Sequence, residues 1–354
     1  MANLTLAERK RALTALVTKI NKKAGDQIIV DSANIPVIDA ISTGSPKVDA
    51  LLGINGVAKG RLTELYGEEG SGKSTFCYML AANAQKTYPE ELVVYIDVEQ
   101  ACSLEYCAKL GVDLDPSRFL LVQPDSGAQA LQIMEDFVES GLCSLVILDS
   151  IAALITEQEL NGEAGDQFMA VLPRLLGAPI KRLTTLAKRA NTACVFINQT
   201  RSTMALHGSP TTTPGGKVLK FQASTRIEVK RIEYLKDSKD IPFGAKLRIR
   251  LIKSRFSPPH TMTECNLIFG VGIDQVIESV DVAVDKKIIV QGGAWFKVPV
   301  QGKDLIQFQG KEKVYDYFRS DSDALAYLNS LLFTKKTTIT EVVDPADLEE
   351  TDEE

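Results

Sequence analysis

The octapeptide Gly67–Ser74 constrains the fold of this chain more than any other segment. Its sequence, GEEGSGKS, matches the pattern GxxxxGK[ST], and the apolar run Leu62–Tyr66 directly precedes it. The glycines let the backbone curl so that successive N–H groups converge on a phosphate, and the following helix adds its positive N-terminal end. Because the pattern stands between a strand-like run and a helical stretch, it predicts a nucleotide-binding α/β domain rather than a chance glycine-rich turn.

The loop and one later strand carry the residues that would contact ATP and magnesium. Lys73 is expected to reach the β- and γ-phosphates, and the Ser74 hydroxyl to coordinate Mg²⁺. The apolar run Leu145–Leu148 ends at Asp149, whose carboxylate would hold the same ion through water. The other nucleotide contacts predicted in the loop are Gly67, Glu68, Glu69, Gly70, Ser71, Gly72 and Thr75.

Strand-like runs alternate with amphipathic helical stretches from about Leu62 onward, which is typical of βαβ units and a mainly parallel sheet. Arg226–Ile232 and Lys246–Ile252, joined by a polar loop, are expected to extend this sheet. Residues 270–332 predict a small further αβ unit that contains the single tryptophan, Trp295. The runs are Leu62–Tyr66, Leu92–Ile96, Phe119–Val122, Leu145–Leu148 and Ala193–Ile197, and the helical stretches include Ser74–Gln85 and Ala128–Ser140.

Polar side chains follow two more of these runs. Asp97 and Glu99 come after the second run, and Gln199 comes after the fifth. Since ligands in such sheets bind beyond the carboxyl ends of the strands, we expect these three side chains and Asp149 to converge on one crevice. Glu99 is placed to orient and deprotonate a water for attack on the γ-phosphate. An ordinary strand cap explains any one of these residues alone, whereas the set indicates a hydrolytic site.

The N-terminus predicts one amphipathic helix. Thr5–Glu8 has a capping-box pattern, and Gly25 is a plausible stop. The apolar positions between them follow at helical spacing: Leu13, Leu16, Val17 and Ile20. A helix this short is marginal alone in water, so its stripe needs a partner in its own domain or in a neighbouring subunit.

Composition indicates a cytoplasmic protein. No apolar run approaches the length of a membrane span, and the first residues lack the apolar region of a secretory signal. The chain has six cysteines without a CxxC pair and only two histidines, which disfavours zinc and favours buried reduced thiols.

The formal charge of −6 neither supports nor excludes a nucleic-acid partner. Eight carboxylates lie between Glu341 and Glu354 without a basic residue, and without them the charge of the remainder becomes +2. A tail of that composition cannot bury a core, so it is expected to be disordered.

These motifs, in order and at similar spacing, resemble bacterial RecA recombinases from the N-terminal helix to about Leu332. Many ATPases share the phosphate loop, but the whole ordered set is specific. The segments are Ile41–Ser45, Gly67–Thr75, Ile96–Glu99, Lys109–Asp113, Gln123–Asp125, Leu148–Leu154, Phe196–Gln199 and Gly215–Gly216.

The resemblance implies a RecA-like P-loop core that assembles as a helical filament on single-stranded DNA. The filament would pair that strand with a homologous duplex and promote strand exchange, with DNA-stimulated ATP hydrolysis. The resemblance makes Glu99 the hydrolytic base and Gln199 the group that senses the γ-phosphate. Tyr106 would stack on adenine, and Ser103 stands where the family usually has aspartate. Lys253 and Arg255 resemble paired lysines that reach ATP from the adjacent subunit, which would stabilise transition-state charge in trans.

Two loops are expected to carry DNA. The first, Glu159–Met169, contains two glycines and precedes Arg174, and the second spans Thr200–Lys220. Glycines let the backbone approach phosphates, cations neutralise them, and an apolar side chain can wedge between bases. Two ordinary surface loops are the alternative. The residues predicted to bind DNA are Met169, Arg174, Arg201, Met204, Gly215, Gly216, Lys217 and Lys220.

The resemblance also sets the expected domains and partners. We expect an N-terminal polymerisation segment at 1–36, an ATPase core at 37–273, a small αβ domain at 274–333 and an acidic tail at 334–354. Single-strand-binding and loader proteins join DNA and the chain itself as implied partners, and no membrane is involved.

Several departures from the family pattern indicate a divergent member, of cellular or phage origin. Pro173 and Pro179 fall where the family has a continuous helix, and internal prolines are expected to kink or end it. Pro214 replaces a threonine in the second loop.

Three other interpretations share some of these features. A nucleotide or small-molecule kinase would need a lid with several arginines, and no such cluster is visible. A hexameric helicase or a clock- or repair-type ATPase shares the core but lacks the combination of N-terminal helix, Asn198-Gln199 and the Gly215-Gly216 loop. A non-hydrolysing scaffold predicts a damaged site, whereas Lys73, Glu99 and Asp149 are all present.

Overall fold

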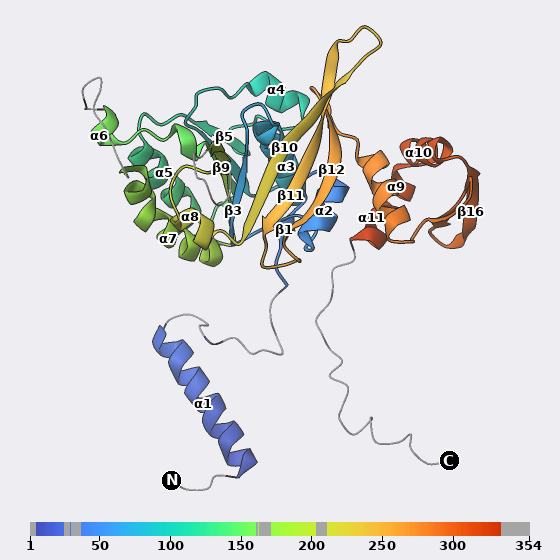
Figure 1. Cartoon of the computed structure of the whole chain (residues 1–354). Coiled ribbons are helices and arrows are strands. Elements are labelled where there is room, and N and C mark those ends of the chain that lie inside the picture. The colour runs from blue at the N-terminus through green and yellow to red at the C-terminus, as the bar shows by residue number, and fades with distance from the viewer. Residues whose placement is uncertain are drawn as a thin grey trace. The chain divides into compact units, whose positions relative to one another are not determined.

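The computed structural model describes residues 5–24, 29, 37–160, 162, 171–202 and 211–333. The chain divides into two compact units, one of residues 1–38 with 335–354 and one of residues 39–334 (Figure 1). The first unit contains α1 (Leu6–Ala24). The predicted capping box is present, because the Thr5 N–H donates to the Glu8 carboxylate and the Glu8 N–H donates to the Thr5 hydroxyl. The predicted stop at Gly25 and the acidic tail at 334–354 lie outside the described residues.

In the described residues, the second unit is built on a sheet of nine strands in the order β13-β12-β11-β10-β3-β7-β6-β4-β5. The strands from β10 to β5 run parallel, and those from β10 to β13 are antiparallel. The mainly parallel sheet is therefore confirmed. The strand bounds are β3 (Leu62–Gly67), β4 (Leu92–Asp97), β5 (Phe119–Val122), β6 (Cys143–Asp149), β7 (Ala193–Gln199), β10 (Thr225–Lys236), β11 (Pro242–Lys253), β12 (Thr261–Ile268) and β13 (Gly272–Ile273).

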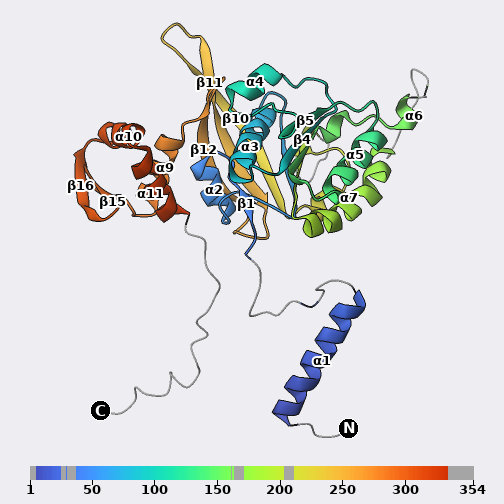
Figure 2. The ribbon, with the colours of Figure 1, turned by 180° about the vertical axis from the view of Figure 1, so that it is seen from behind.

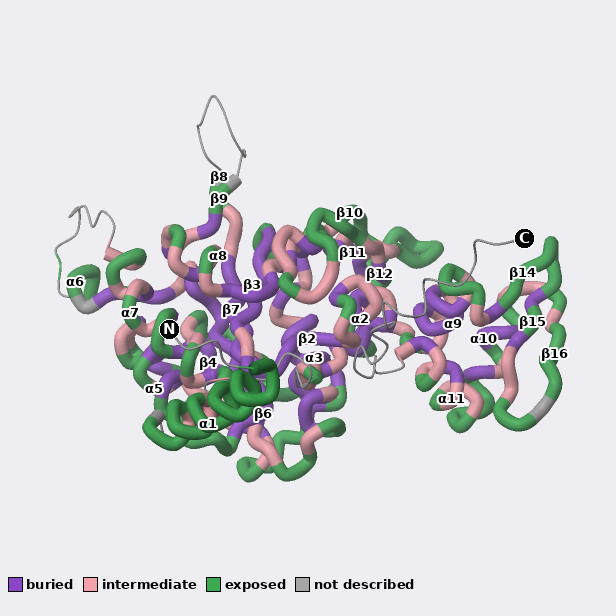
Figure 3. The backbone as a smooth tube through the Cα atoms, turned by 90° about the horizontal axis from the view of Figure 1, so that it is seen from below, coloured by how far each residue is buried: buried purple, intermediate pink, exposed green. Residues whose placement is uncertain are grey.

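Helices cover both faces of the parallel strands, and this explains why those strands are continuous apolar runs. Val93 and Tyr95 of β4 share a buried cluster with α3 (Lys73–Thr87). Val94 and Ile96 face the other way and share a cluster with α5 (Gly127–Glu139) and α7 (Val171–Ala190). Figure 2 shows α5 and α7 side by side, and Figure 3 shows the buried backbone concentrated in the strands between these layers. Among the described residues, no helix is long and apolar enough to cross a membrane.

Pro173 and Pro179 do not end α7, so the predicted end of the helix is wrong, while the predicted kink stays a prediction. Pro173 lies in the first turn, where its missing N–H has no intrahelical partner to lose. Pro179 lies inside the helix and removes one backbone hydrogen bond there. The helix continues because its buried face, which includes Leu176 and Ile180, packs against the sheet and α5.

The remaining elements of the core connect or cap the sheet. β10 and β11 are longer than predicted, and their hairpin projects beyond the sheet (Figure 1). The short elements are β1 (Ala40–Ile41), α2 (Pro46–Leu52), β2 (Val57–Ala58), α4 (Leu104–Lys109), the 3₁₀ turn Ile151–Ala153, α6 (Glu157–Leu160), β8 (Arg201–Ser202), β9 (Thr211–Thr212) and α8 (Val218–Gln222).

The C-terminal elements form a small αβ layer with its own buried cluster around Ile289, Phe296 and Phe318. Trp295 is about half exposed and lies outside that cluster. The division into domains at 36, 273 and 333 stays a prediction. The elements are α9 (Gln275–Asp285), β14 (Val290–Gly292), β15 (Trp295–Val300), β16 (Lys303–Gln309), α10 (Lys311–Ser320) and α11 (Ser322–Leu332).

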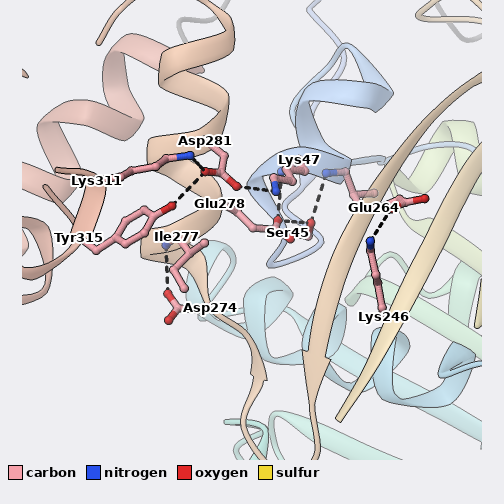
Figure 4. Close-up of polar contacts among 11 residues, drawn as sticks. Ser45, Lys47, Lys246, Glu264, Asp274, Ile277, Glu278, Asp281, Lys311 and Tyr315 are labelled. Atoms are coloured by element: carbon pink, nitrogen blue, oxygen red, sulfur yellow. Dashed lines mark hydrogen bonds and ion pairs between the residues drawn. The ribbon is translucent and has the colours of Figure 1, made fainter. Parts of the chain in front are cut away.

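Polar contacts join α9 to the N-terminal end of α2 (Figure 4). The Ser45 hydroxyl donates to the buried Glu278 carboxylate, and Lys47 pairs with Asp281, which also binds Lys311. Burial raises the pKa of Glu278 to about 7. The contacts combine a buried carboxyl group with a partly buried ion-pair network, so this junction is sensitive to the protonation of Glu278.

Candidate active site

The phosphate loop connects the end of β3 to the start of α3. Gly70 and Gly72 have positive φ values of 65° and 89°, which side chains with a Cβ rarely adopt. The Lys73 ammonium donates to the backbone carbonyls of Gly67 and Glu68 at 3.2 and 2.7 Å. Burial lowers the pKa of Lys73, and the nearby Asp149 and Glu99 carboxylates oppose that shift. The loop therefore holds a largely buried cation above the N-terminus of α3.

A cavity of about 390 Å³ opens over this loop. Most of the nucleotide contacts predicted from the sequence line it, whereas Gly67, Glu68, Asp97 and Ser103 are not among its lining residues. The described residues that line it are Glu69, Gly70, Ser71, Gly72, Lys73, Ser74, Thr75, Glu99, Tyr106, Asp149, Ile197, Gln199, Arg231, Tyr234, Ala245, Leu247, Leu267 and Phe269.

Asp149 and Ser74 meet at the floor of the cavity. The Ser74 hydroxyl donates to the Asp149 carboxylate at 2.8 Å, and the buried Tyr95 hydroxyl donates to the same oxygen at 2.5 Å. Burial raises the pKa of Asp149, and these two hydrogen bonds oppose that shift. A hydroxyl and a carboxylate oxygen are hard donors, so the pair fits a Mg²⁺ ion shared with a phosphate.

Glu99 and Gln199 form a second polar pair at the cavity. The Gln199 amide donates to the Glu99 carboxylate at 3.1 Å, and the Ser150 hydroxyl donates to the same oxygen at 2.5 Å. Each residue stands at or just beyond the carboxyl end of its strand, as the sequence predicted. The arrangement holds a carboxylate beside the phosphate loop, where it can accept a proton from water.

Asp97 does not join the crevice in which the sequence analysis expected it. Its buried carboxylate accepts hydrogen bonds from the backbone N–H groups of Ala101 and Cys102 and from the Gln123 amide. These donors hold the carboxylate in the loop that follows β4. Ser103 caps α4 by accepting from the Tyr106 N–H at 3.3 Å. Tyr106, three positions later, does line the cavity.

The sequence analysis missed one wall of the cavity. Arg231 and Tyr234 come from the long hairpin strand β10, and Phe269 follows β12. The Arg231 guanidinium donates to the Gly70 carbonyl at 2.6 Å and lies 4.4 Å from the centre of the Tyr234 ring. Their sequence signal is weak, because only the strand order β12-β11-β10-β3 brings this part of the chain beside the phosphate loop.

Lys253 and Arg255 are not among the described residues that line the cavity. The Lys253 ammonium instead donates to the Lys220 and Phe221 carbonyls at 2.9 and 2.7 Å. Burial lowers the pKa of Lys253, and the positive charge of Arg255 acts in the same direction. Arg255 is exposed. Within one chain, Lys253 therefore lies with α8 rather than with the phosphate loop.

Arg174 of α7 and the described part of the second predicted DNA loop present exposed cations and closely packed glycines. Arg174, Arg201 and Lys217 are exposed. Gly215 and Gly216 both have positive φ, and a Cβ on Gly215 would meet the Leu176 side chain at 2.6 Å. The Lys220 ammonium donates to the Thr212 hydroxyl, so it bridges α8 and β9. Met169 and Met204 lie outside the described residues.

A buried polar chain connects β7 to the end of the second loop, and the sequence analysis missed it. The Asn198 amide donates to the Glu64 carboxylate at 3.0 Å and to the Pro214 carbonyl at 3.2 Å. Glu64 is fully buried and pairs with Arg226 at 2.5 Å. Because Asn198 directly precedes Gln199, a displacement at the cavity end of β7 would also move this anchor of the loop.

Comparisons with known proteins show to which proteins this chain is similar. Residues 11–274 match the family model of the RecA N-terminal domain. A curated protein named Protein RecA from Ruminococcus albus is 40% identical over 332 residues, which cover 93% of this chain and 81% of the relative. Protein RecA of Geobacter metallireducens is 37% identical over 331 residues, which cover 92% of this chain and 95% of the relative. A crystal structure of the RadB recombinase matches the fold with a TM-score of 0.50 at 22% identity, covering 66% of this chain and 98% of that chain.

Proposed function

The chain belongs to the RecA family, and on that premise we propose that it is an ATP-dependent homologous recombinase. It assembles as a helical filament on single-stranded DNA, pairs that strand with a homologous duplex and promotes strand exchange. The observation that carries the proposal is the joint position of two polar pairs, Ser74 with Asp149 and Glu99 with Gln199, around one cavity at the phosphate loop.

ATP hydrolysis uses these residues in separate roles. The loop N–H groups and Lys73 bind the phosphates, and Lys73 leaves its two backbone carbonyls to do so. Ser74 and Asp149 would hold Mg²⁺, which would neutralise charge on the phosphate oxygens. Glu99 takes the proton of the attacking water, and the Ser150 hydroxyl keeps its carboxylate oriented. Tyr106 stacks on the adenine.

Gln199 couples the nucleotide to DNA. When the γ-phosphate is present, the Gln199 amide exchanges its Glu99 contact for a phosphate oxygen. That exchange moves the end of β7 and, through Asn198 and Pro214, the second DNA loop. Arg174 and the cations and glycines of this loop then bind the DNA backbone largely without regard to the base sequence.

The adjacent subunit completes the site. Lys253 and Arg255 do not line the cavity of their own chain. They are available to the phosphates of ATP bound to the adjacent subunit, where they stabilise transition-state charge. The contact of Lys253 with the Lys220 carbonyl links this cation to the DNA-binding loop. The apolar stripe of α1 docks on the neighbouring subunit, because a single short helix cannot bury it alone.

The cellular setting follows from the same proposal. We place the filament in the cytoplasm, where single-strand-binding and loader proteins act on the same DNA. The six cysteines, all of them in the described residues, carry free thiols, which suits a reducing compartment.

ATP turnover and electron microscopy together test this function. Turnover is low for the chain alone and rises several-fold with single-stranded DNA, and micrographs of the ATP-bound chain with DNA contain extended filaments. Turnover that is indifferent to DNA, or discrete rings in place of filaments, would contradict the proposal and favour a helicase-like ATPase.

A further inference from the structure

Two cysteine thiols touch each other beside the nucleotide cavity. The Sγ atoms of Cys102 and Cys107 lie 3.6 Å apart. Cys102 is half-buried, whereas Cys107 is fully buried in the core cluster that packs α3 and α4 against the sheet. The hydrogen bond between the two thiols lowers the pKa of Cys102, and that hydrogen bond and burial raise the pKa of Cys107. The more accessible sulfur is therefore also the more readily ionised one.

The thiol pair spans the start of α4, the helix that presents Tyr106 to the cavity. Cys102 directly precedes the helix cap Ser103, and the Cys107 N–H donates to the Ser103 carbonyl at 2.9 Å. A disulfide needs an S–S distance of about 2.05 Å, so the two sulfurs must approach by roughly 1.6 Å. The cap and the first turn of the helix must absorb that movement, and Tyr106 lies within that turn.

Aromatic contacts extend the connection to the floor of the cavity. Tyr78 belongs to the buried core cluster against which Cys102 packs, and its ring contacts the Tyr106 ring edge-on at 6.3 Å between centroids. Tyr78 also packs against Tyr95 at 5.2 Å, and the Tyr95 hydroxyl donates to Asp149. A change at the thiol pair therefore reaches both the adenine wall and the expected magnesium ligand through side chains in direct contact.

We propose that Cys102 and Cys107 form a peroxide-sensitive thiol pair whose reversible disulfide weakens nucleotide binding in the neighbouring cavity. The disulfide itself follows from the geometry of the two sulfurs, while its effect on binding rests on the nucleotide site proposed above. The pair acts as a modification site in which oxidation, rather than a bound ligand, alters the position of Tyr106.

The chemistry balances with hydrogen peroxide as the oxidant. The Cys102 thiolate attacks one peroxide oxygen, the O–O bond breaks, and Cys102 becomes a sulfenic acid while hydroxide leaves and is protonated to water. The Cys107 sulfur then attacks the Cys102 sulfur, the S–O bond breaks, and a second water leaves with the Cys107 proton. A dithiol such as dithiothreitol reverses the reaction by thiol–disulfide exchange.

Peptide mapping of the full chain tests the disulfide. The chain is treated with peroxide, its remaining thiols are alkylated, and it is digested with a protease that cuts after glutamate. Cleavage at Glu99, Glu105 and Glu135 separates residues 100–105, with Cys102, from residues 106–135, with Cys107. We expect these two peptides to remain linked, with a loss of about 2 Da, until dithiothreitol separates them. Alkylation of both cysteines after peroxide treatment would overturn the thiol pair.

Binding of a fluorescent ATP analogue tests the consequence. We expect the oxidised chain to bind it about fivefold more weakly or worse, and dithiothreitol to restore the affinity. Cys102→Ala and Cys107→Ala should each make the affinity insensitive to peroxide. Cys143→Ala, which alters a buried cysteine in the cluster on the other face of the sheet, should keep the sensitivity.

The two results separate the inference from the proposed function. A linked peptide with unchanged affinity would overturn the effect on nucleotide binding. A reduced chain that binds no ATP analogue contradicts the proposed function, and the linked peptide then still supports the thiol pair. Peroxide sensitivity that persists in both Cys102→Ala and Cys107→Ala would assign the effect to other cysteines and overturn the proposal.

Discussion

The side-chain amide of Gln199 donates a 3.1 Å hydrogen bond to the carboxylate of Glu99, and this bond joins the ends of β7 and β4 across the intervening β6. One partner is the proposed base and the other is the proposed γ-phosphate sensor. A nucleotide phosphate that accepts a hydrogen bond from the Gln199 amide therefore also frees the Glu99 carboxylate to accept a proton from water.

Glu99→Gln should stop hydrolysis while keeping ATP-bound filaments. The amide cannot accept the proton of the attacking water, so we expect kcat to fall by about 10²- to 10⁴-fold. Its size and its contacts with Gln199 and Ser150 are nearly preserved, so nucleotide affinity should stay close to that of the parent chain. Single-turnover hydrolysis and filtration binding measure the two effects. The exposed Glu105→Gln on α4 is the matched control, and loss of ATP binding in Glu99→Gln would show that its role is misassigned.

Lys73→Ala should abolish nucleotide-dependent filaments. The substitution removes the buried cation that the phosphates need, and we expect nucleotide affinity to fall by about a hundredfold or more. Lys86→Ala, at an exposed position on the same helix, should leave filaments intact. Electron microscopy with and without ATP provides the measurement. Filaments of Lys73→Ala that still depend on ATP would rule out this role for the lysine.

Gln199→Ala should make ATP turnover less dependent on single-stranded DNA. Without the amide, binding of the γ-phosphate is no longer coupled through residue 199 to Asn198 and the second loop. We therefore expect stimulation of turnover by single-stranded DNA to drop about tenfold. Basal turnover should change much less. Gln132→Ala on the exposed face of α5 is the control. If DNA stimulates Gln199→Ala as strongly as the parent chain, the coupling runs through another group.

Deprotonation of Glu278 should make the chain less stable as the pH rises. Burial raises its pKa from an ordinary value of 4.5 to about 7, so the folded state holds this proton more tightly than the unfolded state. The stabilisation is complete below about pH 4.5 and is lost as the pH passes 7, with a size of up to about 3 kcal/mol. Asp49, whose pKa burial also raises to about 7, acts in the same window.

Glu278→Gln tests that prediction, because the glutamine has no charge to bury. The free energy of unfolding is measured with urea at pH 5 and at pH 8. It should fall less between the two pH values in Glu278→Gln than in the parent chain. The exposed Glu312→Gln on α10 should follow the parent chain. An equal loss in all three chains would exclude Glu278 as the cause.

Removal of Glu341–Glu354 should tighten DNA binding. These fourteen positions carry eight carboxylates, which compete with DNA phosphates for the cationic surface. Binding isotherms at two salt concentrations measure the effect, and the gain should be larger at low salt because salt screens the competition. A glycine–serine segment of equal length should give the same gain as the deletion. Unchanged affinity and unchanged salt dependence would contradict competition between the acidic tail and DNA.

Local patterns were sufficient to predict the parallel half of the sheet and its phosphate loop. The predicted run Phe119–Val122 coincides with β5, and the other four runs differ from their strands by at most two residues at either end. These strands are buried on both faces, so their apolar runs are long and unambiguous. The hairpin of β10 and β11 was predicted too short, because most of the residues at its far end, Tyr234 and Phe243 among them, are exposed and follow no pattern of burial.

Within the candidate site, strand-end polar residues were predictable and their partners were not. Glu99, Asp149 and Gln199 do meet at one cavity, as the topology of parallel strands requires. Asp97 stands only two residues from Glu99 yet turns to the backbone of Ala101 and Cys102. Pattern and spacing place a residue at a strand end, but the direction of its side chain depends on which donors the following loop brings close.

The sequence by itself determined the nucleotide-binding core, because the phosphate loop and the buried strands are encoded in contiguous residues. Only the tertiary structure decided that Arg231 reaches Gly70, that Asn198 holds Pro214 and that Cys102 touches Cys107 beside Tyr106. Arg231 and Gly70 are 161 positions apart, and a contact of that kind forms only when the strand order fixes which segments become neighbours. The phosphate loop could thus be identified from eight residues of sequence, whereas the contacts of Arg231, Asn198 and Cys102 follow from packing.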